Sequence, residues 1–193
     1  MVKINFADQH DYGYEVPPCS RRDLVEHAHA IHKAIGYKGD GPFPILELVE
    51  KGFYYLYDDY VFEVVSEAEM GDDLGKTWPN EHVIRVREDV YEAACEGQGF
   101  ARMILGHESS HLLRHEGIPV SMACRKADKH LPAYKSSEWQ ANAMSGALLM
   151  PSCKIIEMSI DEIVEKYQVS TGAAEMQLCS IRKEARKWRI PEL

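Results

Sequence analysis

The sequence has few features of secreted, membrane-spanning or disulfide-stabilised proteins. The first residues, Met1–Phe6, contain no apolar stretch of the kind found in signal peptides, and no charge-free apolar run is long enough to cross a bilayer. The five cysteines are odd in number, scattered and never arranged as C-x-x-C, which argues against a disulfide framework or a cysteine-ligated zinc site. We therefore expect a cytoplasmic protein that makes no contact with a membrane.

Positive charge is also scarce. Lys and Arg number 22 against 31 Asp and Glu, which gives a formal net charge of −9. Because an acidic surface repels phosphate backbones, we expect no direct binding to nucleic acid. The one basic cluster consists of Arg182, Lys183, Arg186, Lys187 and Arg189. Cations in such a place are typical of a solvated helix end.

Nothing in the sequence divides the chain into separate domains. It contains no internal repeat, low-complexity tract or linker, and 193 residues suffice for one sizeable core. Residues 1–19 are polar and include Pro17 and Pro18, so we expect an irregular N-terminal arm. Residues 20–193 are then expected to form a single domain, in which residues 158–189 have the pattern of a helix-turn-helix.

Hydrophobic periodicity predicts an α+β fold. Ser20 and Asp23 have the pattern of a helix N-terminal cap, and the helix that follows is expected to end at Gly36. A second, short helix is expected over Ile45–Lys51. Three segments are rich in aromatic and β-branched residues or alternate in polarity, as strands do. They are Phe53–Tyr57, Tyr60–Val65 and Val83–Arg87.

The last of these strands is expected at an edge of the sheet, because Arg85 and Arg87 alternate with Ile84 and Val86. From Glu88 onward the pattern is helical with interruptions. The sequence therefore predicts helices, a small mixed or antiparallel sheet, and a helical C-terminal half.

One mostly apolar segment carries the candidate chemistry. Residues His107–His111 read H-E-x-x-H within Phe100–Leu113, which is predicted to be a buried helix. Side chains four residues apart project from the same helix face, so both imidazoles can reach one tetrahedral zinc ion. Glu108 then lies beside the metal, where a general base for the attacking water has to be. Burying two histidines and a glutamate without a metal would be costly.

Other histidines are weaker metal ligands. His115 continues the series, but it lies about 12 Å from His107 along a straight helix, which is too far for one ion. His130 stands in a predicted loop and is a weak candidate. His29 and His32 lie three residues apart on the first helix, where histidines are more often surface residues than ligands.

Glu138 is the favoured third ligand. Ser137 can cap a helix that runs to Met150, and Glu138 lies in the first turn of this helix. Two histidines and one glutamate leave a fourth position open for water, which is the pattern of catalytic rather than structural zinc sites. Asn142, one turn further along the same face, is expected to orient a ligand.

Several linked segments resemble the ImmA/IrrE family of metallo-endopeptidases, whose patterns are A-H-E-x-G-H, E-x-x-A-N-x-F-A and L-L-M-P. The segments are Arg102–Leu113, Glu138–Met144 and Leu148–Pro151. The resemblance implies a zincin-like fold in which a small sheet packs on the active-site helix. It also implies one zinc ion held by His107, His111 and Glu138, with Glu108 as the catalytic glutamate.

The resemblance further implies a class of substrate. Known members of the family, from bacteria and phages, are implicated in cleaving helix-turn-helix repressors of mobile elements or stress regulons. We therefore expect a zinc-dependent, gluzincin-like endopeptidase whose partner is a co-encoded transcriptional repressor. The side chain that stabilises the oxyanion is not given by the sequence, and Tyr134 and His115 are the candidates.

Two other interpretations remain open. Ser109 and Ser110 stand where the family usually has an apolar residue and a glycine, so a zinc-binding interaction protein with weak or no cleavage is one alternative. The second is a DNA-binding regulator formed by the predicted helices Ser159–Tyr167 and Ser170–Arg186. Its recognition helix has no cation in its first two turns, where base-reading side chains normally lie, and this alternative is therefore disfavoured.

Overall fold

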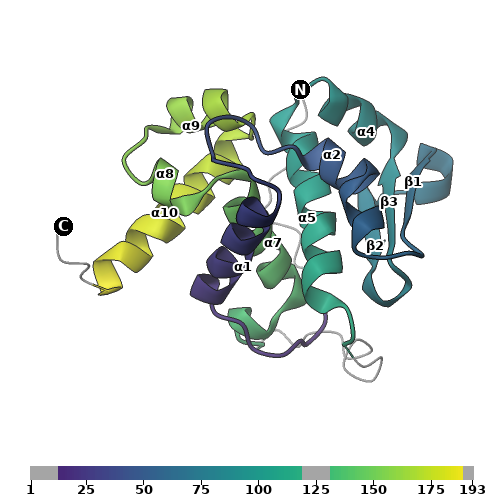
Figure 1. Ribbon diagram of the computed structural model, residues 1–193, viewed down its shortest axis with the longest axis horizontal. Helices are drawn as coiled ribbons and strands as arrows, with labels where there is room; N and C mark the ends of the chain where they lie inside the picture. Colours follow the sequence, from purple (N-terminus) through teal and green to yellow (C-terminus); the bar gives the residue numbers. More distant parts are fainter. Residues whose placement is uncertain (1–12, 119–130, 189–193) are drawn as a thin grey trace.

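The computed structural model describes residues 13–118 and 131–188 of the chain, and it has the predicted α+β architecture. Figure 1 shows a small sheet on one side of the molecule, the long helix α5 (Gly99–His115) beside it, and α7 (Ser137–Leu149) with the C-terminal helices beyond. The described residues also form α1 (Arg21–Ala34), α2 (Ile45–Glu50), α3 (Glu67–Met70), α4 (Glu88–Cys95), α8 (Ser152–Ile155), α9 (Ile160–Tyr167) and α10 (Thr171–Trp188). Three 3₁₀ turns lie in the connections: η1 (Gly52–Tyr55), η2 (Pro79–Glu81) and η3 (Ala133–Lys135).

The three strands of the sheet lie in the order β1 (Val61–Val65), β3 (Val83–Arg87), β2 (Gly75–Trp78). Strand β3 pairs in parallel with β1 and antiparallel with β2. The predicted strand at Val83–Arg87 is confirmed, but its expected position at a sheet edge is wrong. Alternating polarity reports which face of a strand is buried, and it carries no information about the neighbours on either side.

Arg85 shows how an arginine fits in a central strand. It points to the exposed face, where it forms an ion pair with Glu63 of β1 and lies 5.2 Å from the ring of Trp78 in β2. On the other face Ile84 and Val86 are fully buried. The two neighbouring strands thus supply partners for the charged face, while the apolar face packs on the core.

The predicted strand at Phe53–Tyr57 is wrong, because this segment begins as the 3₁₀ turn η1. Phe53 is fully buried and packs 5.2 Å from the ring of Tyr60, whereas Tyr55 is 89% exposed. Strand propensity describes how side chains fit a pleated, half-buried surface. Here one aromatic anchor is buried and its neighbours face solvent, which suits a tight turn.

The helix caps follow the sequence closely. Ser20 caps α1, and both hydrogen bonds of its capping box with Asp23 are present, as predicted. The cap of α7 is Ser136 rather than the predicted Ser137, although Glu138 still lies in the first turn. The Ser137 hydroxyl instead accepts a hydrogen bond from the backbone of the N-terminal arm.

Helices α5 and α7 run antiparallel and in close contact. A Cβ added at Gly106 of α5 would lie 2.4 Å from Leu149 Cδ1 and 2.7 Å from Ser145 Oγ of α7. A side chain at this position would therefore force the helices apart. Because Gly106 has no side chain, the two backbones can approach each other. This approach brings the face of α5 that carries the H-E-x-x-H motif towards the start of α7.

A single buried cluster connects the N-terminal and C-terminal helices. It contains Ala28 of α1, Leu105 of α5, Leu148 of α7 and Leu178 of α10, together with residues of the sheet. Within the described ranges, none of the helices combines the length and the apolar character that crossing a bilayer requires.

A polar cluster around His82 joins the sheet to the end of α5. The His82 ring stacks on Tyr57, with 4.1 Å between the ring centroids, and its Nδ1 lies 2.6 Å from Asp59 Oδ1. Its Nε2 lies 3.3 Å from Glu116 Oε1, immediately after α5. Partial desolvation opposes protonation, but the hydrogen bonds with Asp59 and Glu116 raise the pKa of His82 overall.

We expect this cluster to make stability depend on pH. A raised folded-state pKa means that the protonated ring stabilises the fold below the unfolded pKa of about 6.5, and that this contribution is lost as the pH rises through the folded-state pKa. The difference in free energy of unfolding between the wild type and His82→Gln should therefore be largest below about pH 6. Urea titrations of the metal-free proteins over a pH series measure it. A difference that is constant or grows with pH contradicts the assignment.

Candidate metal centre

Three predicted ligand side chains converge between α5 and α7. The Nε2 atoms of His107 and His111 lie 3.0 Å apart, one helical turn from each other. Glu138, from the first turn of α7, places Oε2 3.1 Å from His107 Nε2 and Oε1 3.3 Å from His111 Nε2. Among the described residues, this is the group of His, Cys, Asp and Glu side chains with ligand atoms close enough to hold one ion.

The spacing of these atoms suits a tetrahedral ion. Bonds of about 2.0–2.1 Å at tetrahedral angles separate neighbouring ligand atoms by about 3.3 Å. The separations of 3.0, 3.1 and 3.3 Å are close to this value. Two imidazole nitrogens and a carboxylate also form the donor set of catalytic zinc sites. The residues present therefore fit a zinc ion in both geometry and chemistry.

Asn142 fixes the orientation of His107. Its Oδ1 lies 3.0 Å from His107 Nδ1. Because an amide oxygen only accepts hydrogen bonds, Nδ1 carries the proton and Nε2 is left with its lone pair facing His111 and Glu138. Asn142 was expected to orient a ligating histidine or glutamate, and its contact here is with the ring of His107.

His115 orients His111 in a similar way. The two Nδ1 atoms lie 3.0 Å apart, so one ring donates to the other. Burial, followed by the charge of His111, lowers the pKa of His115 to about 3, so its ring is neutral. A neutral His115 can accept the Nδ1 proton of His111, which leaves His111 Nε2 free to face Glu138. His115 therefore acts on a ligand, and its position does not favour the oxyanion role considered for it.

Glu108 is buried between α5 and β2. Thr77 Oγ1 donates a hydrogen bond of 2.6 Å to Glu108 Oε2 and lies 3.1 Å from the Glu108 carbonyl oxygen. A Cβ added at Gly75 would lie 2.8 Å from Glu108 Cγ, so β2 passes directly against this side chain. Strand β2 thus holds the predicted base in one orientation beside the ligand histidines.

The histidines and carboxylates of the centre shift one another's pKa values. Burial works against ionisation of Glu138, but the hydrogen bonds and charges of His107 and His111 hold its pKa well below the usual range. Burial lowers the pKa of His107, whereas Glu138 and Glu108 raise it, with a net upward shift. Burial and the same two carboxylates raise the pKa of Tyr14 to about 12. The shifts of His107 and Glu138 agree that a positive charge next to the carboxylates is favoured, whereas burial is the largest cause of the Tyr14 shift.

Comparison with protein families agrees with this geometry. The model described as the IrrE N-terminal-like domain (Peptidase_M78) matches residues 70–178, which is more than half of the chain. The chain belongs to this family. The resemblance predicted from the sequence is confirmed, and the protein is a member of a metallopeptidase family. No curated protein and no solved structure matches the chain.

The weaker ligand candidates His29 and His32 lie on α1 and do not belong to the group of converging side chains. His29 is exposed, whereas His32 is buried with its Nε2 2.7 Å from the Leu148 carbonyl oxygen, where it links α1 to α7. His130 lies outside the described residues. Tyr134, the second candidate for the oxyanion, is 48% exposed and lines a hollow of about 390 Å³ whose lining includes none of the three expected ligands.

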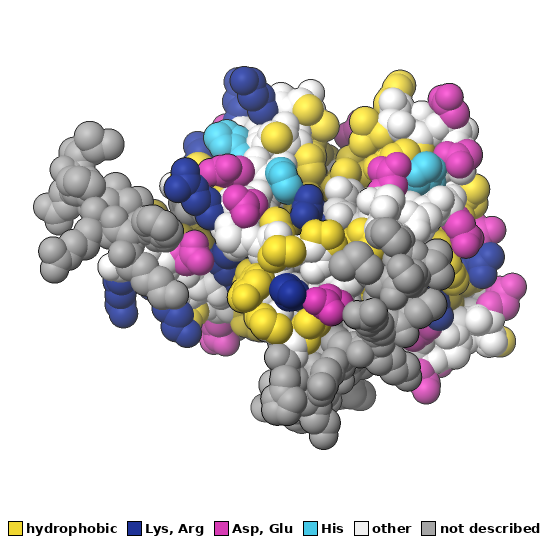
Figure 2. All heavy atoms as spheres, turned by 90° about the horizontal axis from the view of Figure 1, so that it is seen from below, with side chains coloured by type: hydrophobic (Ala, Val, Ile, Leu, Met, Phe, Trp, Pro, Cys, Tyr) yellow, Lys and Arg dark blue, Asp and Glu magenta, His cyan; other side chains and the backbone are white. Residues whose placement is uncertain are grey.

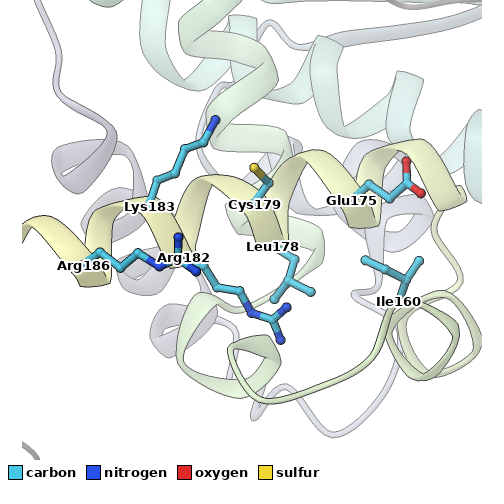
Figure 3. A pocket seen from close by; sticks show the side chains of 7 residues that line it. All are labelled: Ile160, Glu175, Leu178, Cys179, Arg182, Lys183 and Arg186. Atoms are coloured by element: carbon cyan, nitrogen blue, oxygen red, sulfur yellow. The ribbon is translucent and has the colours of Figure 1, made fainter.

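The described cations of α10 lie away from the start of that helix. Helices α9 and α10 form at the predicted helix-turn-helix segment. A hollow of about 330 Å³ is lined by Ile160, Glu175, Leu178, Cys179, Arg182, Lys183 and Arg186, whose side chains are drawn in Figure 3. Arg182 donates to the carbonyl oxygens of Ile156 and Met158, so it holds the connection between α8 and α9.

Charge is also unevenly distributed over the face shown in Figure 2. Lys and Arg side chains gather on the side of the molecule that carries α10, and Asp and Glu side chains gather on the side of the sheet. The sequence of α10 places its first cation, Arg182, beyond the first two turns, which are the turns that a recognition helix presents to bases.

Four residues of the site have no clear signal in the sequence. Gly75 and Thr77 lie in β2, a strand of four residues that is too short for a visible alternation. Gly13 and Tyr14 lie in the arm, where nothing in the local pattern indicates contact with a helix 120 residues away in the chain. Long-range pairing brings all four residues to the site.

The two serines within the motif are both fully buried. Ser110 Oγ donates a hydrogen bond of 2.7 Å to the Gly106 carbonyl oxygen, so this hydroxyl is accommodated inside its own helix. Ser109 Oγ has no hydrogen-bond partner within the part of the chain that the structure describes. A buried hydroxyl in this state costs stability.

We expect Ser109→Ala to stabilise the metal-free protein by about 1 kcal/mol, because the change removes an unsatisfied hydroxyl and improves helix propensity. Urea unfolding measures the change. Ser110→Ala is the matched control, since it gains the same propensity but loses a hydrogen bond, and it should be closer to neutral. A Ser109→Ala protein that is less stable than the wild type contradicts this interpretation.

Proposed function

We propose that the protein is a zinc-dependent endopeptidase that hydrolyses a peptide bond in a protein substrate. The observation that carries the proposal is the convergence of His107, His111 and Glu138, with the buried Glu108 adjacent to the first ligand. Membership of a metallopeptidase family supports it. In this proposal the three converging residues hold one zinc ion, and Asn142 orients His107.

The donor set favours zinc over the harder cations. Calcium and magnesium take predominantly oxygen ligands, whereas two imidazoles and a carboxylate suit zinc and similar transition metals. When bound, zinc lowers the pKa of a coordinated water to about 7 and polarises the substrate carbonyl.

Glu108 is proposed as the general base and then the general acid. Its carboxylate takes a proton from the attacking water and delivers it to the nitrogen of the departing amine. Thr77 donates to Oε2, which leaves Oε1 as the oxygen available for this transfer. Because the carboxylate is held between α5 and β2, it needs little reorganisation during the reaction.

Strand β2 is the proposed binding edge for an extended substrate. In the described part of the sheet β2 has one neighbour, β3, so its other edge can accept a further strand. Thr77 of β2 contacts Glu108, so a peptide added along this edge passes next to the base. The strand Val83–Arg87, which the sequence predicted at a sheet edge, cannot take this role because it lies between β1 and β2.

We further propose that the substrate is a co-encoded helix-turn-helix repressor and that the enzyme works in the cytoplasm of a bacterium. DNA-binding repressors carry basic surfaces, and the net charge of −9 on this chain favours encounter with such a partner. The same charge opposes direct binding to nucleic acid.

Glu138 is expected to be essential for tight zinc binding. The wild type should bind one zinc ion per chain. Glu138→Ala should weaken the zinc affinity by more than about tenfold, because a direct ligand is lost. Competition with a chromophoric chelator measures this. Glu92→Ala is the control, since Glu92 is an exposed residue of α4. Unaltered affinity in Glu138→Ala removes this residue from the ligand set.

Glu108→Gln should keep the zinc and lose cleavage. Removing a general base lowers the rate by about 100-fold or more, while the metal ligands are untouched. The test incubates the purified repressor encoded next to the gene with wild type, Glu108→Gln and Glu92→Gln, and follows the products by mass spectrometry. Equal cleavage by Glu108→Gln rejects the mechanism. Zinc binding by the wild type without cleavage favours an interaction protein instead.

A further inference from the structure

The N-terminal arm, residues Gly13–Cys19, is bound along the segment that leads into α7. Glu15 and Ser136 form an antiparallel bridge, and Val16 and Cys19 are buried. Five hydrogen bonds of 2.9–3.1 Å fasten the two segments: Val16 N to Lys135 O, Cys19 N to Tyr134 O, Ser137 N to Tyr14 O, Tyr14 N to Ser137 Oγ, and Gln140 Nε2 to Pro17 O. The arm lies outside residues 70–178, which the family model covers.

Gly13 lies directly against Glu138. A Cβ added to Gly13 would lie 2.2 Å from Ser137 Oγ, 2.8 Å from Glu138 Cγ and 3.0 Å from Glu138 Oε1. Gly13 also has a φ of +59°, which side-chain-bearing residues rarely adopt. The backbone of the arm thus packs against the Glu138 side chain and limits the positions that the carboxylate can take.

Tyr14 extends the contact to a second ligand. Its ring lies edge-on to His115, with 5.8 Å between the centroids. His115 in turn makes the Nδ1 contact of 3.0 Å with His111. Tyr14 therefore packs on the residue that orients His111, while its own backbone is held by Ser137, next to Glu138.

We propose that Gly13 and Tyr14 are positioning residues of the metal centre, which hold Glu138 and the His111–His115 pair in the arrangement that binds zinc. The inference rests on the proposed zinc site and goes beyond it, because it makes the arm a part of that site. Groups that orient metal ligands commonly contribute tenfold to 100-fold to metal affinity.

Gly13→Ala is the decisive variant, and Gly36→Ala is its matched control. Gly36 has a φ of +71°, and nothing lies within 4 Å of a Cβ added there. Gly36→Ala therefore introduces the same kind of backbone strain as Gly13→Ala without a contact on Glu138. We expect Gly13→Ala to bind zinc about 10-fold to 100-fold more weakly than the wild type, and Gly36→Ala to bind it normally. Affinity is measured by chelator competition at constant pH. Circular dichroism and thermal unfolding of the metal-free proteins confirm that both variants fold.

The outcomes separate the inference from the proposed function. If wild type and Gly13→Ala bind zinc equally well, the arm has no positioning role and the inference is overturned. If Gly36→Ala loses as much affinity as Gly13→Ala, general strain explains the loss and the inference is likewise overturned. If the wild type itself does not bind zinc, the proposed function fails, and this is read directly from the same titration.

Variants of Tyr14 test the second contact. Tyr14→Phe keeps the ring against His115, so its zinc affinity should stay within about twofold of the wild type, whereas Tyr14→Ala should lose about tenfold. Cobalt(II) substitution adds a spectroscopic measurement, because its visible absorption reports tetrahedral coordination, and Tyr14→Ala should change that spectrum while Tyr14→Phe preserves it. A Tyr14→Ala protein with the affinity and spectrum of the wild type removes Tyr14 from the proposal.

Discussion

The close approach of α5 to α7 at Gly106 is the contact on which the metal centre depends. The two helices run antiparallel, so His107 faces Asn142 and His111 faces Glu138 once Gly106 rests against Ser145 and Leu149. A wider separation would move the carboxylate away from both rings while leaving each helix intact. The distance between the two helices therefore decides whether the three side chains converge. A change in this distance would affect the metal centre more than it would affect the fold.

Electrostatics explains why such a cluster holds together. Two carboxylates, Glu108 and Glu138, share a partly buried space with two imidazoles, and burying unpaired charge is costly. The directions of the pKa shifts agree that a positive charge between these groups is stabilising. A divalent cation would supply this charge without a proton, and a neutral His115 behind His111 would keep the His111 Nε2 lone pair available to it.

Elements on two sides of the helix pair complete the site. Strand β2 fixes Glu108 through Thr77, and the N-terminal arm lies against Glu138 and His115. Both segments are short, and they orient the side chains of the site without contributing a candidate ligand. This division suits a metal site, since the rigid helices carry the candidate ligands and the flanking segments limit how those side chains point.

Local sequence determined the spacing of His107 and His111, the place of Glu108 beside them, and most helix ends. The spacing of His107 and His111 reflects the helical repeat, and the cap at Ser20 depends on contacts within one turn. Hydrophobic periodicity also predicted the residues of β3, because burial of one face of a strand makes buried and exposed residues alternate. Tertiary structure alone decided that β3 is central, that Phe53 begins a turn, that β2 exists, and that Thr77, Gly13 and Tyr14 reach the site. These features arise from pairing between segments far apart in the chain. A local sequence pattern indicates which residues are buried, but it does not indicate which other segments those residues pack against.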